Sequence, residues 1–213
     1  MADLFSSYQG TWPAYVAVVD VETTGFAPPQ AQMIEWGIVL LDDGKIMGEH
    51  SSLVRLDAGM RWDYRAQEVH GIGEHEIKDA PTLAAAGAQI EELLKGRIVV
   101  AHNAAFDRPF VAHAIGSAGR KCPPAARWLD TMLIMKAMVA GTSLDEFDSL
   151  EELGRWLGSN FRGAGYKLSD MVRRAKLGTD YAAHRALGDA RATAQAYLKL
   201  DEWAGPMPKS WKW

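Results

Sequence analysis

Residues 15–21 form an apolar run rich in β-branched side chains, and this run constrains the fold more than any other feature. Such a run is typical of a buried β-strand. A second run covers residues 32–41, and a third covers residues 46–54. Between them, Asp42-Asp43-Gly44-Lys45 has the composition of a tight hairpin turn. The chain is therefore predicted to open with an antiparallel meander of three strands.

The rest of the chain predicts alternating strands and helices. After an irregular stretch at 55–80, the pattern predicts strands over 97–101 and 127–129. It predicts helices over 81–95, after the strand at 97–101 to about residue 116, from Asp130 onward, and near 149–157, 167–176 and 186–200. Asp130 is a candidate N-cap for the helix that it opens. This order predicts an α/β fold with a mixed sheet, in which parallel strands extend the meander and helices flank the sheet. We expect one domain over residues 14–203, with tails at 1–13 and 204–213.

Composition excludes several classes of protein. The chain has 213 residues, 48% of them hydrophobic and 23% charged, which is typical of globular proteins. No stretch has the roughly 18 consecutive apolar residues that a membrane helix needs, and the N-terminus does not have the pattern of a secretory signal. Cys122 is the only cysteine, so an internal disulfide is excluded. These observations predict a cytoplasmic protein that does not associate with membranes.

Two acidic side chains lie at the end of the first predicted strand. Asp20 and Glu22 are two residues apart, so a strand would point both to the same face. Adjacent carboxylates repel one another, and a divalent cation such as Mg²⁺ or Mn²⁺ would relieve that repulsion. The alternative is a pair of surface charges in contact with solvent.

Three more residues are candidates for the same chemistry. Asp107 follows the fourth predicted strand, where it could also stabilise the first turn of a helix. Asp189 lies on a predicted helix among alanines, so its carboxylate needs a partner. His184 lies five residues earlier and cannot face the same way from one regular helix. We expect it to precede that helix on a more mobile segment, or else to be an ordinary surface histidine.

Together these motifs resemble the DnaQ-like 3′–5′ exonucleases of the DEDDh group, which includes the proofreading epsilon subunit of bacterial DNA polymerase III. The matching stretches occur in the family's order over about residues 14–200: Val19-Asp20-Val21-Glu22-Thr23-Thr24-Gly25, Ile34-Glu35-Trp36-Gly37, Val69-His70-Gly71-Ile72, Ala101-His102-Asn103-Ala104-Ala105-Phe106-Asp107, Leu129-Asp130-Thr131, Ser149-Leu150-Glu151-Glu152-Leu153 and His184-Arg185-Ala186-Leu187-Gly188-Asp189-Ala190. The third catalytic motif has histidine at 184 and no tyrosine four residues before Asp189, which excludes the tyrosine group.

The resemblance implies a ribonuclease-H-like fold and a two-metal nuclease. It implies that the metal ligands are Asp20, Glu22, Asp107 and Asp189, with Asp20 bridging two Mg²⁺ or Mn²⁺ ions. It also implies that His184 is the general base, and histidine changes its protonation near neutral pH. The implied reaction is hydrolysis from the 3′ end of single-stranded DNA with release of nucleoside 5′-monophosphates.

The resemblance also implies contacts to the substrate and a set of partners. Thr23, Thr24, His70 and Phe106 would bind the terminal nucleotides, whereas Glu35 has no evident role. The expected partner is a single-stranded DNA 3′ end, or RNA in the alternative below. The sequence leaves open whether the chain is a polymerase subunit that proofreads or a free enzyme of repair or nucleotide scavenging. Two alternatives remain open: a 3′–5′ exoribonuclease related to oligoribonuclease or ribonuclease T, and a silent module that binds nucleic-acid ends or a polymerase.

The net charge of −4 at first argues against a nucleic-acid partner. However, residues 161–213 carry 10 Lys and Arg against 5 Asp and Glu, so the acidic excess lies upstream. If four of the carboxylates hold cations, the remaining formal charge is balanced. We therefore expect binding to be confined to a short strand end.

Overall fold

The computed structural model describes residues 10–178 and 184–213. Within these ranges the strands form one five-stranded sheet in the order β3-β2-β1-β4-β5. The strands are β1 (Tyr15–Thr23), β2 (Met33–Asp42), β3 (Lys45–Leu53), β4 (Ile98–Ala101) and β5 (Trp128–Asp130). β1 is antiparallel to β2 and β2 to β3, whereas β4 and β5 run parallel to β1. The predicted meander extended by parallel strands is confirmed.

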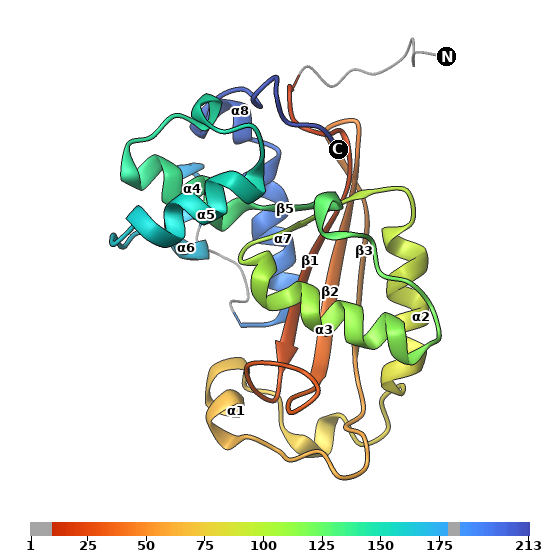
Figure 1. Cartoon of the computed structure of the whole chain (residues 1–213). Helices are drawn as coiled ribbons and strands as arrows, with labels where there is room; N and C mark the ends of the chain where they lie inside the picture. Colours follow the sequence, from red (N-terminus) through yellow and green to blue (C-terminus); the bar gives the residue numbers. More distant parts are fainter. Residues whose placement is uncertain (1–9, 179–183) are drawn as a thin grey trace.

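Helices cover both faces of the sheet (Figure 1). They are α1 (Tyr64–His70), α2 (Leu83–Leu94), α3 (Ala104–Ser117), α4 (Thr131–Ala140), α5 (Leu150–Asn160), α6 (Leu168–Arg174), α7 (Ala186–Tyr197) and α8 (Leu200–Trp203). Side chains alternate along β1, so Val16 and Val18 join the core beneath α7, while Ala17 and Val19 join the core beneath α2 and α3. Each face of the sheet therefore has its own apolar layer.

Local signals in the sequence account for several of these elements. Asp43 and Gly44 both have positive φ angles, of 53° and 75°, as the tight turn between β2 and β3 requires. The Asp130 side chain accepts a hydrogen bond from the Met132 amide, which confirms it as the N-cap of α4.

Some boundaries differ from the sequence prediction. The stretch predicted to be irregular contains α1, a helix of seven residues capped by Asp63. The helix predicted over 186–200 is interrupted at Leu198, and α8 follows as a separate short helix. Both differences involve helices too short for a hydrophobic period to be recognised in the sequence.

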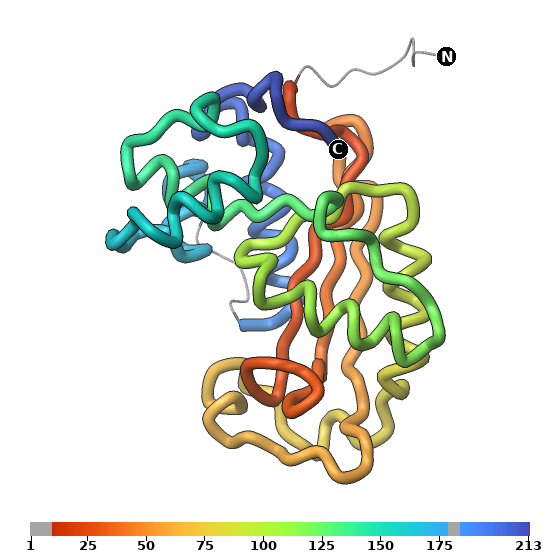
Figure 2. The backbone as a smooth tube through the Cα atoms, in the orientation of Figure 1, coloured from red at the N-terminus to blue at the C-terminus, as the bar shows by residue number. Residues whose placement is uncertain are grey.

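The two ends of the described chain lie side by side (Figure 2). The rings of Trp12 and Trp211 are 6.1 Å apart, and the Met207 amide donates to the Thr11 hydroxyl at 2.7 Å. Trp211 is buried, and its indole Nε1 donates to the Phe147 carbonyl at 2.9 Å. The C-terminal segment thus packs on the body of the protein. The domain boundary after residue 203 stays a prediction, and residues 1–9 of the predicted N-terminal tail lie outside the described residues.

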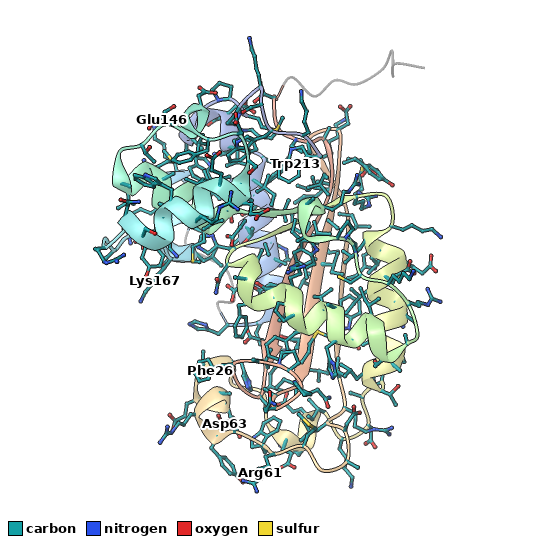
Figure 3. The ribbon with its side chains drawn as sticks, viewed as in Figure 1. Phe26, Arg61, Asp63, Glu146, Lys167 and Trp213 are labelled. Atoms are coloured by element: carbon teal, nitrogen blue, oxygen red, sulfur yellow. The ribbon has the colours of Figure 1, made fainter. Side chains whose placement is uncertain are left out.

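The helical part around α4–α6 and the loops around α1 occupy different ends of the molecule. Figure 3 labels Glu146 and Lys167 on the helical part, and Phe26, Arg61 and Asp63 on the loops around α1. Between these two parts, β1 ends and α7 begins (Figure 1). In the described residues, no helix is both long and apolar enough to cross a membrane.

Candidate active site

β1 supplies the first two acidic side chains of the candidate site. Asp20 and Glu22 continue the face that carries Val16 and Val18, so both point toward α7. β4 pairs with β1 only along Val16–Val18. The last part of β1 therefore extends beyond its parallel neighbour, and Asp20 and Glu22 lie half-buried at the end of the sheet.

α7 supplies the third acidic side chain of the candidate site, Asp189. Asp189 lies in the first turn of the helix, and carboxylate oxygens of Asp20, Glu22 and Asp189 all lie within 4.8 Å of one another. Within residues 10–178 and 184–213, this is the group of acidic or metal-ligating side chains close enough to share an ion. Three carboxylates are a donor set of hard oxygens, which is the type that Mg²⁺ and Mn²⁺ prefer. The side chains therefore fit the predicted kind of metal.

Asp107 lies beside this group on α3. Its Oδ1 accepts a hydrogen bond from the Val21 backbone amide at 3.2 Å, on the part of β1 that β4 does not reach. Asp107 is buried, and its charge acts directly on Asp20. All four predicted carboxylates thus gather around the end of β1, with three in the tight group and Asp107 adjacent to it.

The electrostatics of the group favour cation binding. Burial raises the pKa of Asp20 well above its usual value, and the neighbouring Asp107 and Asp189 add to the effect. Burial, followed by the charges of Asp189 and Glu35, raises the pKa of Glu22 to about 8. Burial also raises the pKa of Asp107 and of Asp189. A divalent cation stabilises the charged form of such carboxylates, so ionisation of this group and cation binding favour each other.

His184 precedes α7, as the spacing to Asp189 predicted. It has a positive φ angle of 62°, its side chain is exposed, and its backbone amide donates to Asp189 Oδ2 at 3.0 Å. This hydrogen bond connects the conformation at His184 to the carboxylate of the tight group. Residues 179–183, just before His184, lie outside the described residues.

The predicted substrate-binding residues have mixed surroundings. Thr23 and Thr24 are buried, and their hydroxyls are bonded within the loop after β1, to the Gly25 carbonyl and the Gln32 amide. Phe106 is half-buried with its ring 5.4 Å from that of Phe110. Their contact with substrate stays a prediction.

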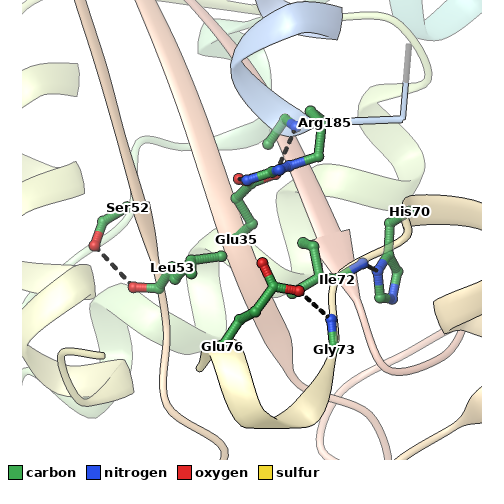
Figure 4. Close-up of polar contacts among 9 residues, drawn as sticks. Glu35, Ser52, Leu53, His70, Ile72, Gly73, Glu76 and Arg185 are labelled. Carbon is green, nitrogen blue, oxygen red and sulfur yellow. Dashed lines mark hydrogen bonds and ion pairs between the residues drawn. The ribbon is translucent and has the colours of Figure 1, made fainter. Parts of the chain in front are cut away.

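His70 is buried at the end of α1 (Figure 4). Its Nδ1 accepts from the Ile72 amide at 3.0 Å, so Nε2 carries the proton of the neutral ring. Nε2 has no hydrogen-bond partner in the described part of the chain. Burial lowers the pKa of His70, which favours this neutral form.

Sequence reasoning missed the partnership between Glu35 and Arg185. The sequence places Glu35 in a motif without an evident role, and places Arg185 at the position where the tyrosine group has its tyrosine. In the structure the Glu35 carboxylate accepts from Arg185 Nη2 at 2.6 Å. The motifs that contain the two residues were the available signal, but nothing local connects positions 150 residues apart.

The family model of the RNase T exonucleases, described as "Exonuclease", matches residues 17–197. The chain belongs to this exonuclease family. The match covers every carboxylate of the site and His184, and it confirms the predicted resemblance to DnaQ-like enzymes and the predicted enzyme class, a nuclease of the hydrolase type.

Curated relatives agree with the family. Over 193 residues the chain is 28% identical to a PolC-type DNA polymerase III of Thermotoga petrophila, covering 89% of this chain and 12% of that protein. It is 29% identical to a DNA polymerase III subunit epsilon-like protein of Rhodobacter capsulatus, covering 86% and 23%. It is 27% identical to the 3′-5′ exonuclease DinG of Bacillus subtilis, covering 90% and 18%. The chain thus spans less than a quarter of the length of each of these relatives.

Solved structures confirm the fold. Exonuclease X in complex with 5′ overhanging duplex DNA superposes with a TM-score of 0.63 at 23% identity, covering 92% of this chain and 96% of that one. The nuclease domain of 3′hExo, a DEDDh family member bound to rAMP, superposes with a TM-score of 0.67 at 16% identity, covering 92% and 96%. The ribonuclease-H-like α/β fold expected from the sequence is therefore present.

Proposed function

We propose that this chain is a metal-dependent 3′–5′ exonuclease domain that removes nucleoside 5′-monophosphates from the 3′ end of single-stranded DNA. The observation that carries the proposal is the group of Asp20, Glu22 and Asp189 oxygens within 4.8 Å, in a chain of the exonuclease family. Asp107 completes the four carboxylates that would hold two Mg²⁺ or Mn²⁺ ions. When bound, such ions supply the positive charge that activates water and stabilises the leaving oxygen.

The chain's own residues have separate tasks in this proposal. The four carboxylates are held in place by β1, α3 and α7, so the site is preorganised and need not be assembled during the reaction. His184 takes the proton from the attacking water, for which its exposed side chain has access to solvent. Its backbone amide donates to the Asp189 carboxylate, and this hydrogen bond fixes the distance between the proposed base and a proposed metal ligand.

The names of the relatives support the proposed substrate. Three of them are named as DNA polymerase III proteins or as a 3′-5′ exonuclease, and Exonuclease X was solved with DNA. Thr23, Thr24, His70 and Phe106 are proposed to contact the terminal nucleotides. We also propose that the chain works with a polymerase in the cytoplasm, which co-elution with the replicative polymerase of its host would test.

The test is digestion of 5′-labelled DNA and RNA oligonucleotides of one sequence, with Mg²⁺, with Mn²⁺ and with a chelator. We expect a ladder that shortens from the 3′ end of the DNA, lost with the chelator and with Asp20→Asn. Asp145→Asn, which changes an exposed aspartate on the helical part, is the matched control and should retain the ladder.

Three outcomes would contradict parts of the proposal. Activity in the chelator would exclude the metal, and an unchanged ladder with Asp20→Asn would exclude the site. A ladder on RNA but not on DNA would replace the proposed substrate with RNA, the alternative that the sequence left open.

A further inference from the structure

The first turn of α7 is attached to β2 by one acidic side chain. Glu35 is buried, and both its oxygens accept from Arg185 Nε at 3.1 Å. Oε1 also accepts from Arg185 Nη2 at 2.6 Å, and Oε2 accepts from the Ala186 amide at 2.9 Å. Figure 4 shows the Arg185 guanidinium lying against the Glu35 carboxylate between the strand and the start of the helix. Glu35 thus satisfies a free amide of the helix start as well as the arginine.

The same face of β2 allows the helix to approach closely. Gly37 lies two residues after Glu35, and a Cβ built at Gly37 would overlap backbone atoms of Ala186 and Leu187. The backbone of the first turn of α7 therefore rests directly on the strand. The contact with α7 therefore gives a structural role to Glu35 and Gly37, two residues of the Ile34-Glu35-Trp36-Gly37 motif.

The Glu35–Arg185 pair lies close to both elements that supply the acidic group, β1 with Asp20 and Glu22 and α7 with Asp189. Glu35 is paired in register with Glu22 on β1. Arg185 directly follows His184, and Asp189 lies in the first turn of the same helix. Any shift of the start of α7 relative to β2 would move His184 and Asp189 away from Asp20 and Glu22.

Apolar packing alone does not fix the position of the start of α7 relative to β2. The face of α7 near the site is formed by small side chains, including Ala186 and Ala190, both of which are buried. Small, non-directional contacts resist sliding or rotation of a helix only weakly, whereas a bidentate arginine–carboxylate pair has a defined geometry. Arg185 also balances the charge that Glu35 adds beside Glu22.

We propose that Glu35 and Arg185 are positioning residues, which set the place of His184 and Asp189 relative to the carboxylates of β1. Neither touches the substrate in this role. The inference rests on the proposed exonuclease function for its activity readout.

The chain offers a matched control on the same helix. Arg191 of α7 forms a bidentate pair with Glu49 of β3, at 2.8 Å from Nε and 2.5 Å from Nη2. This pair also joins α7 to the sheet, but it lies near the surface and involves no residue of the acidic group. A general contribution of ion pairs to holding α7 would appear at both pairs, whereas positioning of the site would appear only at Glu35 and Arg185.

The experiment compares Arg185→Ala, Arg185→Lys and Glu35→Gln with Arg191→Ala and Glu49→Gln. For Arg185→Ala we expect kcat on the DNA oligonucleotide to fall about 10- to 100-fold, with KM changed less than about 3-fold, because small displacements of reacting groups have effects of this size. Arg185→Lys should retain an intermediate kcat, and the Arg191 and Glu49 variants should stay within about 2-fold of the parent. Thermal unfolding checks that each variant is folded. If Glu35→Gln does not fold, Arg185→Lys still tests the pair.

Binding of Mn²⁺ without substrate, followed by electron paramagnetic resonance, gives a second readout. Displacement of Asp189 should weaken Mn²⁺ binding several-fold in Arg185→Ala and leave it unchanged in Arg191→Ala. In a double-mutant cycle, Glu35→Gln should add little to the effect of Arg185→Ala, because the two residues act as one unit.

Several results would overturn the inference. Equal kcat in Arg185→Ala and Arg191→Ala would contradict it. A change of KM without a change of kcat in Arg185→Ala would also contradict it, because it would indicate that Arg185 contacts the substrate. Multiplying effects in the double variant would show that the two residues act separately. If the parent has no exonuclease activity, the proposed function fails, but the comparison of Mn²⁺ binding still tests the positioning.

Discussion

The Asp107 carboxylate accepts a hydrogen bond from the Val21 amide at 3.2 Å, across 86 positions of the chain. The bond forms where β1 continues past the end of β4, so a side chain of α3 replaces the missing strand partner. One residue therefore supports the backbone that carries Asp20 and Glu22 and also adds a charge to their site.

Substitution of Asp107 should separate these two tasks. Asp107→Asn retains an acceptor for the Val21 amide and removes a buried charge whose pKa is raised by burial. We expect the metal-free protein to be at least as stable as the parent, and exonuclease activity to fall by about 100-fold or more. Asp107→Ala should lose the same activity and also about 1–3 kcal/mol of stability, because a buried amide is left unpaired. Thermal unfolding with a chelator measures the first effect, and the ladder assay measures the second. A less stable Asp107→Asn protein would contradict the assignment.

Stability without metal should fall as the pH rises. Glu22 has a folded-state pKa of about 8, above the ordinary 4.5 expected in the unfolded chain. Between these values the folded state binds more protons, so the free energy of unfolding decreases from about pH 5 to pH 8. Divalent cations compete with those protons, so Mg²⁺ should raise the melting temperature more at pH 8.5 than at pH 5.5.

Melting curves at the two pH values, with and without Mg²⁺, check this prediction. Glu22→Gln, which cannot ionise, should flatten the dependence on pH in the metal-free protein. An equal effect of Mg²⁺ at both pH values would mean that the cation binds elsewhere.

Replacement of His184 should affect turnover and spare metal binding. His184→Asn keeps the backbone amide that holds Asp189, and asparagine tolerates the positive φ angle of 62° at this position. We expect kcat to fall about 10²- to 10⁴-fold, the usual contribution of a general base. Mn²⁺ affinity should stay at the parent value. Retention of turnover in a folded His184→Asn protein would remove His184 from the proposed mechanism.

Two glycine substitutions should have opposite effects on stability. Gly37→Ala places a methyl group against the backbone of Ala186 and should cost about 1–3 kcal/mol as α7 is displaced. A Cβ at Gly116 on α3 meets no atom within 4 Å, so Gly116→Ala should add up to about 1 kcal/mol from helix propensity. Denaturant unfolding of both variants gives the two values. If Gly37→Ala were as stable as the parent, α7 would not rest on β2 as closely as the structure shows.

The sequence predicted most of the sheet, and the four carboxylates that it singled out lie around the end of β1. Strands β1 to β5 are recognisable because alternation and β-branched runs are local properties, and the turn at Asp43 and Gly44 depends on adjacent residues. The motifs around Asp20, Asp107 and Asp189 indicated a shared site, although the residues lie far apart in the chain. In the structure Asp20, Glu22 and Asp189 lie within 4.8 Å of one another and Asp107 bonds the same part of β1, while the roles of the individual residues stay proposals.

Other features could not be predicted from local pattern. α1 has only seven residues, too few for a helical period to be distinguished from a polar loop. The burial of Trp211 against Trp12 joins opposite ends of the chain, and no local pattern specifies such a pair; the sequence predicted only a tail at 204–213.

The sequence by itself determined the strands and most of the longer helices, because these follow from residue type and short-range spacing, and its motifs indicated which acidic side chains belong to one site. Only the tertiary structure decided how α7 is held against β2. The Glu35–Arg185 pair and the bare backbone at Gly37 depend on two segments meeting in space, and a contact of that kind leaves no periodic signal in either segment.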